Sequence, residues 1–186
     1  MHLRTDGELN PVFCTIVPPH VLDHLSRSAD ARLADPARRT LAADALSRDR
    51  RRITALAATP TRHTAGAVPS KPQRILYDCE TGTTLPGVKV REEGDKPTSD
   101  ASVNRAYAGL GATFELLLSA YGRSSIDGKG LPLIGSVHYG REYNNAFFDG
   151  EQMVFGDGDG EIFLDFTVAV DVIAHELAHG LTQYTA

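Results

Sequence analysis

The last sixteen residues, 171–186, constrain the fold more than any other stretch of the chain. They contain His-Glu-x-x-His within an otherwise apolar run, which predicts an α-helix. Residues four apart lie on one face of a helix, so His175 and His179 present two imidazoles side by side. Apolar side chains recur at similar spacing on another face: Ile173, Leu177 and Leu181. We therefore expect a helix that is buried along its apolar stripe and presents its histidines to a cleft.

Two histidines at this spacing beside a glutamate are a pattern of ligands for Zn²⁺. We expect His175 and His179 to bind the ion as neutral imidazoles and Glu176 to act as a general base. Glu176 would take a proton from water that attacks a carbonyl and pass it to the leaving amine. Two satisfied core histidines are the alternative. A catalytic zinc usually has three protein ligands and an open position, so the third ligand is expected beyond residue 186.

The chain has 186 residues, of which 41% are hydrophobic and 23% charged, a composition typical of globular proteins. Its charge is uneven, with a balance of +5 over residues 1–74 and −10 over residues 75–186. Opposite fields attract, so we expect the basic part to dock on the acidic part. The arginines between Arg48 and Arg52 suggest nucleic acid, but no aromatic residues are interleaved and the overall balance is acidic. We expect neither nucleic-acid binding nor a membrane span, because no apolar run is long enough for one.

A proline-rich stretch without hydrophobic period, residues 59–73, divides the chain and is an expected proteolysis site. Before it, residues 1–58 predict a small unit with a helix over 36–58 that starts at Pro36. After it, the pattern predicts strands and one long helix before the histidine-bearing helix. The strands are expected at 74–78, 88–91, 137–139, 145–148, 152–155 and 162–164, and the helix at 100–121 with Asp100 as N-cap. Residues 156–160 predict a hairpin turn rather than a calcium loop, since they lack the required EF-hand offsets.

The two cysteines, Cys14 and Cys79, are too few for a disulfide framework. Two reduced thiols are preferred over a single disulfide. The polar N-terminus lacks the apolar segment of a secretory signal peptide. The protein is therefore expected either to stay inside the cell or to leave by another route.

The motifs of residues 74–186 resemble the thermolysin-type neutral metalloproteases, the M4 peptidase family. The matching segments are Arg74–Asp78, Leu85–Gly87, Asp100–Tyr107, Arg123–Asp127, Val137–Gly140, Tyr143–Phe148, Gln152–Gly160 and the His-Glu-x-x-His helix. Upstream, Cys14, the Pro18-Pro19-His20 run and Leu22 are similar to the short propeptide of protealysin-like members. The resemblance implies a removable inhibitory propeptide over 1–58, maturation within 59–73, and a catalytic lobe over 74–186.

The resemblance also implies fold and site. The fold would be α+β: a twisted, mostly antiparallel sheet with a long helix, ending in the zinc helix and preceded by the mainly helical propeptide. Asn145 and Ala146 would bind the backbone of polypeptide substrates on an edge strand, where an amide and a carbonyl suit strand addition. Phe148 would belong to the wall of the substrate cleft. Asp171 would be a Ca²⁺ ligand, which is compatible with its being a carboxylate that the helix dipole favours near the helix N-terminus.

Further expectations concern the rest of the molecule. The resemblance implies a glutamate as third zinc ligand and a C-terminal lobe, both beyond residue 186, and export from the cell. A thiolate is a strong zinc ligand, so Cys14 is a candidate latch on the open zinc position, and a buried or free thiol is the alternative. The expected reaction is hydrolysis of peptide bonds before an apolar residue. The rival hypothesis is a non-catalytic protein that binds metal or acts as an inhibitor.

Overall fold

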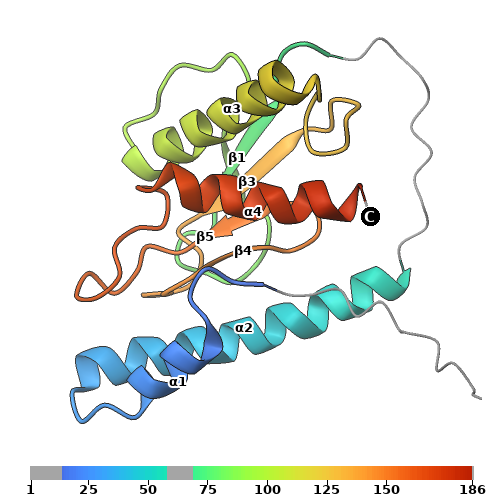
Figure 1. Cartoon of the computed structure of the whole chain (residues 1–186). Helices are drawn as coiled ribbons and strands as arrows, with labels where there is room; N and C mark the ends of the chain where they lie inside the picture. Colours follow the sequence, from blue (N-terminus) through green and yellow to red (C-terminus); the bar gives the residue numbers. More distant parts are fainter. Residues whose placement is uncertain (1–13, 58–68, 186) are drawn as a thin grey trace, which may run out of the picture.

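The computed structural model describes residues 14–57 and 69–185, with side chains described for 14–49 and 69–185 (Figure 1). The N-terminal segment holds α1 (Pro19–Ser26) and α2 (Ala31–Ala57), which contact each other. The larger part that follows contains a five-stranded sheet and two helices. Figure 1 shows α1 and α2 together beside one edge of this larger part.

Helix α2 begins at Ala31, so the predicted start at Pro36 was wrong. The carboxylate of Asp30 accepts a hydrogen bond from the backbone N–H of Arg32 at 3.0 Å. This bond satisfies one of the free N–H groups of the first turn, which lets the helix begin before the proline. Pro36 consequently lies inside the helix, one turn after its start.

The sheet has the strand order β2-β1-β3-β5-β4. Its strands are β1 (Arg74–Asp78), β2 (Val88–Glu92), β3 (Leu133–Val137), β4 (Ala146–Phe148) and β5 (Met153–Phe155). β1 pairs antiparallel with β2, and β4 with β5, whereas β1–β3 and β3–β5 are parallel. The expected α+β class is confirmed, but the sheet is mixed rather than mostly antiparallel. Parallel neighbours need a long crossover, and the segment that contains the long helix supplies the one before β3.

Helices α3 (Ala101–Tyr121) and α4 (Val170–Gln183) cover one face of the sheet. Asp100 caps α3 as predicted, because its carboxylate accepts hydrogen bonds from the backbone N–H groups of Ser102 and Val103. Gly122 ends α3 at φ +62°, a left-handed conformation that suits glycine. α3 packs on β1 and β3, α4 packs on β4 and β5, and the two helices contact each other.

One hydrophobic core joins the N-terminal segment to the larger part. Most of its residues come from α3, α4 and the sheet. Val17, Leu22 and Ala37 of the N-terminal segment belong to the same cluster and are at most 5% exposed. Removal of this segment would therefore expose apolar surface on the larger part.

The region after β5 forms a turn and not the expected hairpin. Residues 162–164 form no strand, so the expected hairpin is wrong. The carboxylate of Asp159 accepts hydrogen bonds from the backbone N–H groups of residues 161–163, which holds a compact turn instead.

Within the described residues, no helix has the length and apolar character needed to cross a membrane.

Several sequence expectations fall outside the described residues. They concern residues 1–13, most of the linker expected at 59–73, and the side chains of Arg50–Arg52. The maturation site and the basic cluster accordingly stay predictions.

Candidate metal centre

Helix α4 approaches the sheet closely because one of its buried positions is a glycine. The buried residues of the helix are Ile173, Glu176, Leu177 and Gly180. A Cβ at Gly180 would lie 3.1 Å from Cζ of Phe148 and 2.8 Å from Cδ1 of Ile126. The absence of a side chain there lets α4 pack against β4. This packing turns the opposite face of α4 away from the sheet.

His175 and His179 lie on that opposite face, one turn apart. Their Nε2 atoms are 3.1 Å apart and their ring centroids 4.8 Å apart. Two atoms that each bind one zinc ion at about 2.0–2.1 Å lie roughly 3–4 Å apart. The pair therefore has the spacing that a shared ion requires.

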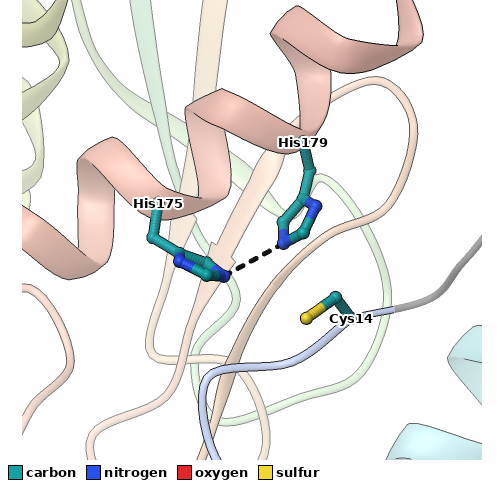
Figure 2. A group of neighbouring side chains, drawn as sticks. All are labelled: Cys14, His175 and His179. Atoms are coloured by element: carbon teal, nitrogen blue, oxygen red, sulfur yellow. Dashed lines mark hydrogen bonds between the residues drawn. The ribbon is translucent and has the colours of Figure 1, made fainter.

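Cys14 faces this pair from the N-terminal segment (Figure 2). Its Sγ and one ring nitrogen of each histidine all lie within 4.8 Å of one another. One thiol and two imidazoles are a donor set that suits zinc. The side chains of this cluster thus fit a zinc ion, and they come from two segments far apart in the sequence. Both cysteines of the chain are free, and Cys79 lies elsewhere in a buried position.

The segment that carries Cys14 pairs with β4 at a single position. Thr15 and Phe147 form an antiparallel bridge. The backbone N–H of Ile16 donates to the carbonyl of Ala146 at 3.2 Å. The N-terminal segment therefore pairs with the edge of the sheet through one β-bridge and the adjoining backbone hydrogen bond.

Asn145 binds the next residue of this segment through both ends of its amide. Its Oδ1 accepts a hydrogen bond from the N–H of Val17 at 2.8 Å, and its Nδ2 donates to the carbonyl of Val17 at 3.2 Å. Asn145 and Ala146 are fully buried beneath the segment. Phe148 is also buried, in the main core against α4, so its role as a cleft wall stays a prediction.

Glu176 and Asp171 occupy different environments on α4. Glu176 has no exposed surface in this closed arrangement. Asp171 is exposed in the first turn of the helix, as the helix dipole favours. Its role as a calcium ligand stays a prediction.

The sequence analysis missed a second cluster, around His138. Nδ1 of His138 lies 2.7 Å from a carboxylate oxygen of Asp157, and Nε2 lies 2.8 Å from one of Asp100. Asp78 also brings a carboxylate near the ring. Carboxylates on both ring nitrogens favour a charged imidazolium that donates twice. The four segments that carry these residues are separated in sequence, so no local pattern indicated the cluster.

Comparison with known proteins places this geometry in a family. Residues 48–183 match the family described as "Thermolysin metallopeptidase, catalytic domain". The chain belongs to the thermolysin metallopeptidase family. The match covers the sheet, α3 and the whole of α4, including both histidines of the candidate centre. The resemblance noted from the sequence motifs is thereby confirmed.

Individual members of the thermolysin family match over part of their length. The "Extracellular metalloprotease" of Pectobacterium carotovorum subsp. carotovorum is 51% identical over 113 residues, which are 61% of this chain and 33% of that protein. A "Thermolysin" of Bacillus caldolyticus is 43% identical over 115 residues, 60% of this chain and 21% of that protein. The chain therefore spans a third or less of the length of these curated relatives.

A solved structure matches both the N-terminal segment and the larger part. It is the precursor of protealysin, a metalloproteinase from Serratia proteamaculans, with a TM-score of 0.77 and 41% sequence identity. The match covers 92% of this chain and 47% of that chain. The shared fold is therefore that of the first half of a thermolysin-family precursor.

Proposed function

We propose that this protein is a zinc-dependent endopeptidase, made as a precursor that its own N-terminal segment inhibits. The observation that carries the proposal is the convergence of Cys14 from that segment with His175 and His179 of α4. Membership of the thermolysin family and the match to a protealysin precursor support it. Residues 1–58 are the propeptide, 59–73 contain the maturation site, and 74–186 form the N-terminal lobe of the catalytic domain.

The reaction is hydrolysis of a peptide bond. His175 and His179 would hold zinc as neutral imidazoles, and a bound ion would supply Lewis acidity toward the carbonyl and the attacking water. Glu176 takes the proton of the attacking water on its carboxylate and gives it to the leaving amine. Glu176 lies on the same helix as His175 and His179, which supports its action beside the metal.

The substrate backbone binds at β4 in extended form. Asn145 offers an amide oxygen and an amide N–H, and Ala146 offers a carbonyl, to one strand of polypeptide. These are the groups that hold Ile16 and Val17 in the closed state. A substrate and the N-terminal segment therefore compete for the same edge, which accounts for inhibition by the segment.

The zinc position is closed by Cys14 in the same state. A thiolate from Cys14 would bind the ion in place of the water that the reaction uses. Cleavage within the linker releases the segment and opens both the edge strand and the metal.

The alternative is a protein that binds zinc without catalysis, or that inhibits another peptidase. The occupation of β4 and of the metal centre by residues of the same chain favours this reading over a simple open enzyme. The two differ in the consequence of removing the carboxylate of Glu176.

The test is the Glu176→Gln variant, expressed beside the wild type from the complete gene and assayed on an unfolded protein substrate after maturation. We expect Glu176→Gln to keep its zinc and to lose activity by about 10²-fold or more, because general base catalysis contributes that much. His175→Ala is the companion variant and is expected to lose zinc as well, as measured by metal analysis. The proposal is wrong if the mature wild-type protein has no peptidase activity, or if the Glu176→Gln variant is as active as the wild type.

A further inference from the structure

Three polar side chains of α2 face the larger part and are not explained by the metal centre. Thr40, Asp44 and Ser47 recur at helical spacing and are 0%, 0% and 8% exposed. Polar groups this deeply buried are costly unless they are hydrogen-bonded. Their contacts therefore matter to how the N-terminal segment binds.

All three contact the loop that leads into β4. Oγ1 of Thr40 accepts a hydrogen bond from the backbone N–H of Asn144 at 2.9 Å. Oγ of Ser47 lies 3.5 Å from the hydroxyl of Tyr139. Between them, the carboxylate of Asp44 receives two hydrogen bonds, which makes it the centre of the row.

The two partners of Asp44 are Tyr143 and Asn145. The hydroxyl of Tyr143 donates to Oδ1 of Asp44, and Nδ2 of Asn145 donates to Oδ2 at 3.1 Å. Nδ2 of Asn145 also donates to Val17, so both N–H groups of this amide are used. An oxygen of the Asp44 carboxyl group accepts a hydrogen bond whether the group is ionised or protonated elsewhere, so it favours the N–H end of the amide facing α2. The oxygen of Asn145 is thereby directed to the N–H of Val17.

We propose that Asp44 is a positioning residue that orients the amide of Asn145. In this way α2 and the segment around Val17 bind cooperatively to the edge at β4 where substrate is proposed to bind. This inference rests on the proposed function, in which residues 1–58 are an inhibitory segment. The segment around Val17 covers the edge at β4 directly. α2 contributes indirectly, because Asp44 holds the Asn145 amide that binds Val17.

The surroundings of Asp44 make the docking of the N-terminal segment dependent on pH. Burial, opposed by the hydrogen bonds from Tyr143 and Asn145, raises the pKa of Asp44 from 3.8 to about 6. The charge of Arg48 on α2 lowers the pKa of Asp44. Tyr139 from the loop and Glu176 from α4 raise the pKa of Tyr143. Release of the segment returns the carboxyl to water and to its ordinary pKa. The docked state thus binds the proton more tightly, so docking strengthens as the pH falls from about 6 to about 4 and weakens as it rises.

The test is hydrogen exchange of the backbone amides of Ile16 and Val17 in the 186-residue chain, measured relative to amides of β3. We expect Asp44→Ala to speed exchange at Ile16 and Val17 by about tenfold or more, the effect of a lost hydrogen bond to a charged group. Asp44→Asn keeps the size of the side chain and decides the question if the alanine variant does not fold. Asp49→Asn, an exposed change on the same helix, is the matched control and is expected to change nothing.

The pH profile separates positioning from a merely structural role. In wild type, protection of Ile16 and Val17, corrected for intrinsic exchange, is expected to rise between pH 7 and pH 5. In Asp44→Asn it is expected to stay flat. The inference is overturned if both Asp44 variants exchange like wild type, if β3 is affected as much as Ile16 and Val17, or if the pH profile persists without the carboxylate. Exchange needs neither zinc nor catalysis, so this result is independent of the Glu176→Gln assay.

Discussion

His138 shows how a single residue ties three elements together. It follows β3, and its ring bonds to Asp100 at the start of α3 and to Asp157 after β5. The bond to Asp157 outweighs desolvation and, with the bond to Asp100, raises the pKa of His138 from 6.5 to about 9. Because the folded pKa exceeds the unfolded one, this stabilisation is fully present below pH 6.5 and is lost as the pH rises through about 9.

The variant His138→Asn tests this account, since asparagine tolerates the positive φ of +54° at this position. We expect it to reduce the free energy of unfolding at pH 7 by on the order of 2 kcal/mol, less than the full shift because the ring is 22% exposed. Urea unfolding at pH 7 and pH 10 measures the difference, which is expected to shrink at the higher pH. An equal difference at both pH values would show that the imidazolium is not the stabilising form.

The residues of the site that helical spacing predicts are those whose pattern is local. His175, Glu176 and His179 follow from helical spacing within five residues. Asp44 and Val17 were missed because their partner Asn145 lies 101 and 128 residues away. Cys14 was raised as a candidate from its chemistry, whereas its closeness to the histidines depends on tertiary structure.

At the scale of elements, the position of α4 depends on how closely it meets α3. A Cβ at Gly109 of α3 would lie 2.4 Å from Cδ1 and 3.3 Å from Cγ2 of Ile173, which is 1% exposed. The two helices are therefore in tight contact at this point, two residues before His175. Few rotamers are open to a buried, β-branched side chain.

We expect Gly109→Ala to lower the free energy of unfolding by about 1 kcal/mol, because overpacking costs about 1–3 kcal/mol and exceeds the gain in helix propensity. The control is Ala112→Gly, at an exposed position of the same helix, which measures propensity alone at about 1 kcal/mol. Urea unfolding of both variants gives the comparison. A more stable Gly109→Ala protein would mean that the helices are not in tight contact.

Element boundaries were predictable where end signals are strong. Asp100 and the apolar period located α3 within one residue, and 74–78 was predicted as β1 without error. The start of α2 was predicted at Pro36 because proline favours the first turn of a helix. The carboxylate of Asp30 caps the helix instead, so it begins earlier. The parallel pairing of β1 with β3 joins strands more than fifty residues apart, and local periodicity carries no information on such pairing.

At the scale of the whole molecule, the N-terminal segment is held mainly by buried contacts. It contributes apolar side chains to the main core and Asp44 to the buried loop contacts. The ion pairs between the two parts, Arg32–Glu161 and Arg39–Glu142, are exposed and each contributes little. The charge asymmetry predicted the docking of the two parts, but burial explains its strength better than the opposite net charges do.

In the precursor, we propose, Cys14 joins His175 and His179 on one zinc ion. X-ray absorption at the zinc edge of the zinc-loaded 186-residue chain tests it most directly. We predict one sulfur ligand at about 2.3 Å beside imidazole nitrogens at about 2.0–2.1 Å.

The cysteine variants identify that sulfur. Cys14→Ser is expected to lose it. Cys79→Ser is expected to keep it, since burial raises the pKa of the Cys79 thiol to about 12 and disfavours the thiolate. A wild-type spectrum with nitrogen and oxygen neighbours alone would contradict the claim.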